Sequence, residues 1–531
     1  MSFLQVTKLL ETSLICSPWF ALATLSPVTL HSWLCQSFLK KLVFQNTGLE
    51  NTGLKNTGLE NTGPENISPE NIGYTHHRQQ NSGTIQGFFI TLTVMIAGLF
   101  FALIALNTSA IGAITLLCAA FCLLGGMVFK PTIARKITIV DVLVLAFFVS
   151  VGVSTAFSSF EKTSLMGLAK FLLFFSGYLT FRVVTHGNTN RLVLLTAAIA
   201  VTGFIESAIG FYQYFAHVQP LATWSDPKIA AELKMTRIYG SIQPLNPNLL
   251  AGYLAPCAAA AFALFLLCLE SIKRLWAKIL LALISGLGCL GILMAIILTG
   301  SRGGFIALAG LLAGAFAYVG HLLWHSPQRQ QLRWGKAVWL LTLLSCLTSV
   351  ALAIGGSEKI RARALSIFAM RQDSSISYRL NVYDSALRII QDNPLLGIGP
   401  GNDTFKQVYG LYMTPGFNAL GAYSVPLEIA VEQGLVGVLL FASLLIVLLF
   451  RVFIVLDAHV LSLAKQLLMG GLLVGVIGCI AYGLFDTIWY RPAVNLVFWF
   501  MVAGLSWLTE PSFHKTRFQE KAGQEETVKG C

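Results

Sequence analysis

Residues 279–299 read ILLALISGLGCLGILMAIILT, a run of 21 residues without a charged side chain. A helix of about 20 apolar residues spans the hydrocarbon core of a bilayer. Similar runs recur along the 531-residue chain, which is 55% hydrophobic and only 11% charged. An ordinary soluble protein is about 25% charged. Because lipid cannot satisfy the backbone of open strands, the sequence predicts an all-α polytopic membrane protein and excludes an ordinary soluble protein.

The apolar runs predict about 12 transmembrane helices. They cover residues 87–106, 109–129, 137–157, 163–183, 192–216, 249–269, 279–299, 303–324, 337–355, 427–450, 466–485 and 493–508. A long loop, residues 356–425, separates the ninth run from the tenth.

Basic residues in the connecting loops predict the orientation, because cytoplasmic loops are enriched in Lys and Arg. With residue 1 in the cytoplasm, thirteen basic residues fall in inner loops and six in the short outer loops. The inner set is Lys130, Arg135, Lys136, Arg182, Arg191, Lys273, Arg274, Lys278, Arg329, Arg333, Lys336, Arg451 and Lys465. The outer set is Lys162, Lys228, Lys234, Arg237, Arg302 and Arg491. We therefore expect a multi-pass protein of the inner (plasma) membrane, with cytoplasmic N- and C-termini and an extracytoplasmic loop 356–425.

This distribution also explains the net charge of +12. Most of the excess sits beside predicted spans, where it sets orientation, so the expected partner is the lipid bilayer and no nucleic acid is expected. The ten cysteines include no CxxC pair, which argues against a disulfide framework or a zinc site. His321 and His325 are spaced i, i+4 without an acidic third ligand nearby. We expect no metal and no cofactor.

Four regions are predicted. Residues 1–45 form an amphipathic N-terminal segment that lies on the inner leaflet. Residues 46–86 form a low-complexity linker built on a pentapeptide repeat, NTGLE NTGLK NTGLE NTGPE NISPE NIGYT at 46–75, which cannot bury a core and is expected to be disordered. Residues 87–508 form the transmembrane domain. Residues 509–531 form a cytoplasmic tail.

The charged residues of the outer face are the first candidates for function. Arg302 lies in LTGSRGGF at the outer mouth of two spans, where a guanidinium either reaches the interface or grips a phosphate or carboxylate. The long loop adds Arg379 and Arg388 as candidate anion-binding residues. Arg379 lies on a predicted amphipathic helix, 378–391, whose apolar positions include Leu380 and Leu387 and which is expected to rest on the membrane surface. Most of the arginines in this loop are expected to lie on a solvated surface and to have no binding role.

Ionisable residues inside predicted spans form a second group. Glu206 and Lys170 are functional candidates because a charge at a helix centre costs roughly 2.5–3.5 kcal/mol on insertion scales. Glu428 and Glu432 are spaced i, i+4 at the start of a span. They either interact with the helix dipole or, if buried, bind a cation or a proton or act as a general acid or base.

Two turns give further expectations. Asp486 and Arg491 are expected to pair in the turn FDTIWYRP. The turn Gly397–Gly401 resembles a phosphate-binding loop only superficially, because it is predicted to face outward, away from ATP.

Three stretches together resemble one family of polytopic membrane proteins. They are SRGG at 301–304, YRLNVYDSALRIIQDNPLLGIGPGNDTF at 378–405 and AYSVPLEIAVEQGLVGVLLF at 422–441. They are similar to the O-antigen ligase and polymerase family. QPLNPNLLAGYL at 243–254 and FDTIWYRP at 485–492 resemble its cyanobacterial IctB-type branch, which is named for bicarbonate transport and inorganic-carbon accumulation. The resemblance covers about 87–508, and the repeat looks like an insertion.

The resemblance implies roles for particular residues. In the ligases, an arginine of the SRG motif and one of the large loop bind a diphosphate-linked sugar lipid; they match Arg302 and Arg379. Glu432 matches the E-x-G-x-x-G pattern. Tyr423 occupies the position of the ligases' loop histidine, and a phenol with a pKa near 10 cannot replace imidazole as a base. The catalytic candidates are thus Arg302, Arg379, Glu432 and Tyr423, and sugar ligation by the usual mechanism is disfavoured.

Two functions therefore stay open. One is a carrier or accessory protein that binds a small anion, bicarbonate by the name of the branch, at the outer face. The other is a metal-independent glycosyltransferase that uses a polyprenyl-diphosphate-linked sugar.

Overall fold

The computed structural model describes most of the predicted transmembrane domain. The described residues are 86–101, 109–129, 137–218, 237–272, 274–325, 339–340, 355–356, 358, 361, 374–487 and 490–510. The predicted segment 1–45, the repeat, nearly all of the predicted ninth span and most of the tail lie outside them.

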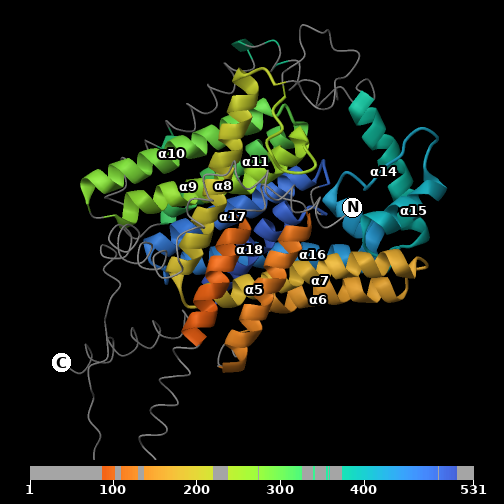
Figure 1. The fold of residues 1–531 in the computed structure, drawn as a ribbon, viewed down its shortest axis with the longest axis horizontal. Coiled ribbons are helices and arrows are strands. Elements are labelled where there is room, and N and C mark those ends of the chain that lie inside the picture. The colour runs from red at the N-terminus through yellow and green to blue at the C-terminus, as the bar shows by residue number, and fades with distance from the viewer. Residues whose placement is uncertain are drawn as a thin grey trace, which may run out of the picture. The chain divides into compact units, whose positions relative to one another are not determined.

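Every regular element in these ranges is a helix, as predicted (Figure 1). The labelled helices are α5 (Ser109–Phe129), α6 (Ile139–Ala156), α7 (Glu161–Thr185), α8 (Thr189–Phe215), α9 (Pro247–Ser271), α10 (Leu275–Leu298), α11 (Arg302–His325), α14 (Ser374–Asp392), α15 (Asn402–Tyr412), α16 (Val425–Asp457), α17 (Leu463–Gly483) and α18 (Pro492–Leu508). A further helix covers Gln86–Phe101.

Eight of these helices are long and apolar enough to cross a membrane: α6 to α11, α16 and α17. The helix Gln86–Phe101, α5 and α18 have shorter apolar stretches. All eleven coincide with predicted spans, and the chain is a multi-pass membrane protein. The total of twelve and the orientation remain predictions.

The chain divides into two compact units. One includes Leu267–Leu283, the end of α9 and the first part of α10. The second holds Asn66–Leu266 and Ile284–Cys531, and every contact discussed below lies within it.

Helix α18 forms the core of the second unit. All its residues from Ala493 to Leu508 are buried, and it packs against α5, α7, α16 and α17. The ring of Trp499 lies 5.0 Å from that of Phe148 and 5.2 Å from that of Phe498, measured between centroids. A helix that is apolar all round is buried, and this one has no lipid-facing side.

A buried ionic network ties α6, α7 and the end of α18 together. Arg182 donates to Asp141 at 3.0 Å and to Glu510 at 2.6 Å, and Tyr178 donates to the same Asp141 at 2.5 Å. Asp141 also accepts the N–H of Thr138, which begins α6 with a capping box. One guanidinium thus bonds to two carboxylates, which stabilises charges that would otherwise be buried without partners.

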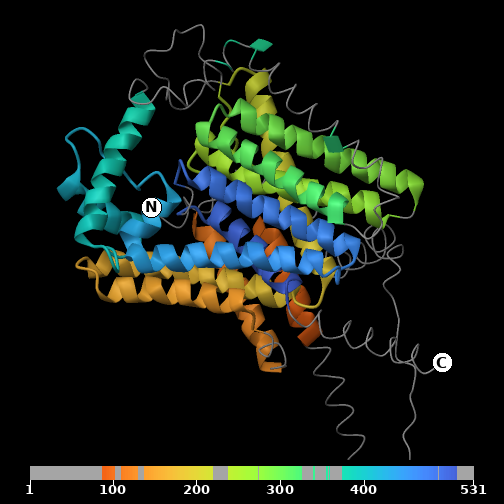
Figure 2. The same ribbon diagram turned by 180° about the vertical axis from the view of Figure 1, so that it is seen from behind.

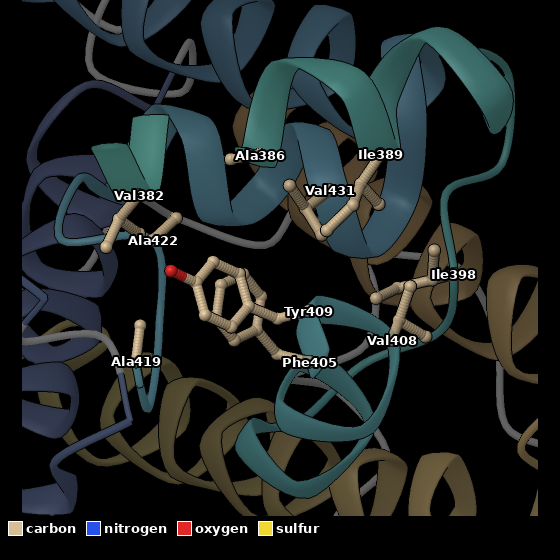
Figure 3. Close-up of a cluster of buried hydrophobic side chains, with 10 residues drawn as sticks. All are labelled: Val382, Ala386, Ile389, Ile398, Phe405, Val408, Tyr409, Ala419, Ala422 and Val431. Atoms are coloured by element: carbon tan, nitrogen blue, oxygen red, sulfur yellow. The ribbon is translucent and has the colours of Figure 1, made fainter. Parts of the chain in front are cut away.

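Helices α14 and α15 lie at the other end of α6, α7 and α16 (Figures 1 and 2). They enclose a small core of their own with the start of α16 (Figure 3). Its buried members are Val382, Ala386, Ile389, Ile398, Phe405, Val408, Tyr409, Ala419, Ala422 and Val431.

The amphipathic helix predicted at 378–391 is confirmed, but its packed face differs from the prediction. Val382, Ala386 and Ile389 are fully buried against α15 and α16, whereas Leu387 is 49% exposed. The apolar face of α14 packs within the protein because α15 and the loop beside it supply a surface that the sequence pattern did not reveal.

Candidate functional site

The candidate site lies at one end of the helices, at the end that carries Arg237, Arg302 and Arg379. We call this region the arginine end. Arg237 precedes α9 and is held by two hydrogen bonds. Its Nε donates to the carbonyl of Thr299 at 2.7 Å and its Nη2 to Oδ1 of Asn248 at 2.8 Å. Asn248 belongs to the motif NPN, whose role is therefore to orient this arginine.

The SRGG motif begins α11 directly beside Arg237. Gly300 has φ +58, and a Cβ added to it would lie 3.5 Å from the Arg237 side chain. The distance is an ordinary contact, so the positive φ is what favours glycine at this turn. Arg302 is the first residue of α11 and is 7% exposed. A snorkelling arginine would have an exposed guanidinium, so its burial favours a role inside the protein.

Gly303 connects the motif to α17. A Cβ on Gly303 would lie 3.1 Å from the ring of Tyr482, a distance at which that ring would have to move. The Tyr482 hydroxyl donates to the carbonyl of Asn248 at 2.5 Å and lies 3.4 Å from Oδ2 of Asp486. Tyr482 thus joins the SRGG motif to the turn after α17.

Arg379 and Asp486 form an ion pair across 107 residues of sequence, with Nη2 3.1 Å from Oδ2. Their side chains are 16% and 10% exposed. Burial raises the pKa of Asp486, while the charge of Arg379 opposes this rise. The predicted pair of Asp486 with Arg491 is wrong: the partner of Asp486 is Arg379 from α14, and Arg491 stands at the N-cap position of α18 without a capping hydrogen bond from its side chain.

Tyr423 stands beside this ion pair. The Arg379 guanidinium carbon lies 5.9 Å from the centre of the Tyr423 ring, within cation–π range. The backbone of Tyr423 has φ +51, a conformation that a bulky residue adopts only when its surroundings enforce it. Burial and the neighbouring Tyr378 raise the pKa of Tyr423, so this phenol stays protonated at neutral pH. Tyr423 packs against a cation and cannot act as a base.

Glu428 and Glu432 are fully buried in the first turns of α16. Oε1 of Glu428 accepts the hydroxyl of Thr487, and Oε1 of Glu432 accepts the hydroxyl of Tyr490 and, at 2.6 Å, the N–H of Gly401. The second oxygen of each, Oε2, has no hydrogen-bond partner in the described part of the chain.

Helix α16 is broken immediately after Glu432. Gly434 has φ +63 and ψ −159, which is not helical, and the chain at Pro394–Gly399 lies along the break. Ile398 and Gly399 donate to the carbonyls of Val431 and Glu432 at 2.9 and 3.1 Å, and Leu435 donates back to Pro394 at 2.8 Å. The backbone groups freed by the break are therefore satisfied within the protein, as a membrane requires.

The glycine-rich turn 397–401 is consequently a structural element. Its amides at Gly397, Ile398, Gly399 and Gly401 all donate to protein oxygens, so none of these four is available to a phosphate. The turn can approach α7 closely because residue 167 is glycine. A Cβ on Gly167 would lie 2.1 Å from the Pro400 carbonyl oxygen. This agrees with the expectation that the turn resembles a phosphate loop only superficially.

The other predicted charges lie elsewhere. Glu206 is buried, and its two oxygens accept the N–H and hydroxyl of Ser241 at 2.9 and 2.5 Å. This fixes the segment before α9, which gives Glu206 a structural role. Lys170 is exposed on α7, although its charge acts on Glu432.

Arg388 donates to the Tyr412 carbonyl at 3.0 Å. Arg388 follows Arg379 by nine residues, which is two and a half turns of an α-helix. The two side chains therefore leave the helix on opposite sides.

Several site residues were missed by sequence reasoning. Arg237 counted only as a loop charge, and Tyr482 gave no signal within an apolar run. Three serines did carry a signal, because Ser150 and Ser154 on α6 and Ser158 just after its end follow one another at intervals of four residues. Ser154 and Ser158 donate to the carbonyls of Glu432 and Ile398 at 2.5 and 2.6 Å, and thus line the break. No cluster of three or more His, Cys, Asp or Glu in the described ranges is placed to hold a metal ion.

Comparison with known proteins agrees with this geometry. Residues 287–442 match the family model described as O-antigen ligase. The match includes the SRGG motif, Arg379, Tyr423 and the broken part of α16. No curated protein matches the chain. The chain is therefore similar to O-antigen ligases over residues 287–442, and its long apolar helices are those of a multi-pass membrane protein.

Proposed function

We propose that the protein is a metal-independent glycosyltransferase that binds a polyprenyl-diphosphate-linked sugar at the outer face of the membrane. The observation that carries this proposal is the arginine end. Arg302 begins α11 there, two residues after Gly300, which contacts Arg237, and Arg379 pairs with Asp486 at the same end. A diphosphate diester carries two negative charges, and guanidinium groups bind phosphate with directed hydrogen bonds.

The chemistry follows from this charge. An acceptor hydroxyl attacks the anomeric carbon of the sugar, the bond from that carbon to the diphosphate oxygen breaks, and polyprenyl diphosphate leaves with its charge stabilised by the arginines. The proton of the hydroxyl needs an acceptor, and Tyr423 cannot serve. Asp486 lies beside Arg379, and its raised pKa makes it a better base than an ordinary aspartate.

Direct binding tests the proposal. The purified protein in nanodiscs is mixed with a polyprenyl-diphosphate sugar, and binding and transfer to an acceptor sugar are measured. Arg379→Ala and Arg302→Ala are expected to weaken binding by about tenfold or more, the effect of losing one charged hydrogen-bonding partner. Arg388→Ala is the matched control on the same helix and should bind normally. Equal binding by wild type, Arg302→Ala and Arg379→Ala would refute the proposal.

A small-anion carrier, with bicarbonate as its substrate, is the second candidate. It is favoured by Tyr423, which occupies the position of the ligases' catalytic histidine and cannot take a proton. In liposomes, uptake of labelled bicarbonate that exceeds empty vesicles and is lost in Arg302→Ala would favour this carrier. Consumption of the lipid-linked sugar without such uptake would favour the transferase.

A further inference from the structure

We propose that Glu428 and Glu432 form a binding site for a small monovalent cation, with sodium as the natural probe. The two residues are on the first half of α16, one helical turn apart, and both are 0% exposed. Residues at i and i+4 share a face of a helix. Both direct Oε1 to the same turn, to Thr487 and Tyr490. Their charges are therefore close together in a dry environment.

The orphaned oxygens point to a ligand. Oε2 of Glu428 and Oε2 of Glu432 are buried and have no hydrogen-bond partner among the described residues. Nearly all buried polar groups in proteins are hydrogen-bonded, and each exception needs an explanation. A proton on Oε2 would leave a buried O–H donor without an acceptor, and a proton on Oε1 would still leave Oε2 without a donor. A cation within reach of both carboxylates would satisfy both oxygens.

Other buried carboxylates of the described chain show the contrast. Asp141 and Glu510 share Arg182, and Asp486 pairs with Arg379. Glu206 has no basic partner among the residues that the structure describes, but both of its oxygens accept hydrogen bonds from Ser241. The glutamate pair has neither arrangement, since no salt bridge is formed by either residue within the described ranges.

The break in α16 adds an independent reason for a cation. Because the helix is interrupted at Gly434, Glu432 lies in the last turn of a short half-helix that starts at Val425. The C-terminal end of a helix carries partial negative charge, which disfavours a carboxylate and favours a cation. Discontinuous membrane helices bind sodium ions in this way at their interrupted ends.

The composition of the site limits the ion. It offers two carboxylates and the hydroxyls of Thr487 and Tyr490. All of these are hard oxygens, which suit alkali and alkaline-earth cations better than zinc or copper. One monovalent ion would leave the pair with a single negative charge. The backbone N–H of Thr487 donates to Oδ1 of Asp486 at 2.8 Å, so this site adjoins the arginine end without sharing a side chain with it.

Equilibrium binding of ²²Na⁺ to the full chain in detergent tests the site. At constant ionic strength in choline chloride, the wild type should bind sodium saturably. Glu428→Gln and Glu432→Gln should each weaken binding by about tenfold or more, equivalent to about 1.4 kcal/mol. Glu206→Gln is the matched control, because it makes the same change at a buried carboxyl whose oxygens are both bonded. Size-exclusion elution verifies that each variant is folded.

The outcomes separate this site from the proposed function. Arg379→Ala should lose lipid-diphosphate binding and retain sodium binding, so either proposal can fail alone. Absence of saturable binding of Na⁺, Li⁺ or K⁺ to the wild type would overturn the cation site. So would sodium binding that survives in the double Gln variant, or a wild type that takes up protons on titration without any dependence on the cation.

Discussion

Substitution of Gly434 by alanine should destabilise the protein by breaking the junction between α16 and the glycine-rich turn. The residue has φ +63 and ψ −159, a region that is essentially restricted to glycine and costs other residues about 1–3 kcal/mol. An added Cβ would also lie 2.4 Å from the carbonyl carbon and oxygen of Leu395. Backbone atoms cannot move aside as a flexible side chain does, and overpacking typically costs about 1–3 kcal/mol.

The two effects together give a loss of about 2–6 kcal/mol. This should lower the Tm of the purified protein by about 3–6 °C, given how unfolding entropy grows with chain length. Thermal unfolding in detergent, followed by intrinsic fluorescence, measures the shift. Hydrogen exchange at Ile398 and Gly399 should accelerate in the variant, because their amides donate to the carbonyls beside the break.

Gly152→Ala on α6 is the matched control. A Cβ at Gly152 meets nothing within 4 Å, and alanine is the better helix former by up to about 1 kcal/mol. Its Tm should be unchanged or slightly higher. If Gly434→Ala unfolded at the wild-type temperature while exchange at Ile398 stayed slow, the reasoning about the break would be refuted.

Three other perturbations follow. Ser154→Ala removes the hydrogen bond to the Glu432 carbonyl. It should cost about 1 kcal/mol more than Ser176→Ala, because the Ser176 hydroxyl donates to Leu173 of its own helix. Equal Tm values of the two variants would contradict this. Arg182 and His186 hold the pKa of Glu510 below its ordinary 4.5, although burial acts in the opposite direction. Its contribution to stability is therefore present above pH 4.5 and is lost as the pH falls through the lowered value. Glu510→Gln should cost about 1.5–3 kcal/mol at pH 7, and the difference in Tm from wild type should shrink as the pH falls from about 5 toward 3; a constant difference would count against it. Deletion of residues 46–75 should leave membrane insertion unchanged, as checked by membrane fractionation, and loss of expression would show that the repeat matters.

The transmembrane helices were predictable because length and hydropathy decide them. Eleven of the predicted spans coincide with helices, and their ends differ by several residues, most in α16, which extends from Val425 to Asp457. The break inside α16 was not predicted, since a glycine in an apolar run is common in membrane helices. The sequence did contain a hint, because Glu432, Gln433 and Gly434 interrupt the apolar pattern together.

The candidate site was predicted only in part. Arg302 and Arg379 stood out by their motifs, and both belong to the arginine end. The partner of Arg379 could not be foreseen, because Asp486 lies 107 residues away and a nearer arginine competed for it. Glu206 was singled out for its depth in the membrane, which sequence reveals, whereas its hydrogen bonds to Ser241 depend on how the intervening loop folds back.

The burial of α18 has a consequence for biogenesis. This helix follows all of its neighbours in the chain, yet it occupies the space between α5, α7, α16 and α17. Those helices enter the membrane first, and the sides of them that face α18 stay uncovered until it arrives. Assembly of the bundle is therefore completed after translation of α18. The ion pair between Glu510 and Arg182 then fixes the end of α18 to α7. A ribosome that stalls before Pro492 would leave earlier helices inserted around an unfilled centre, a substrate for membrane quality control.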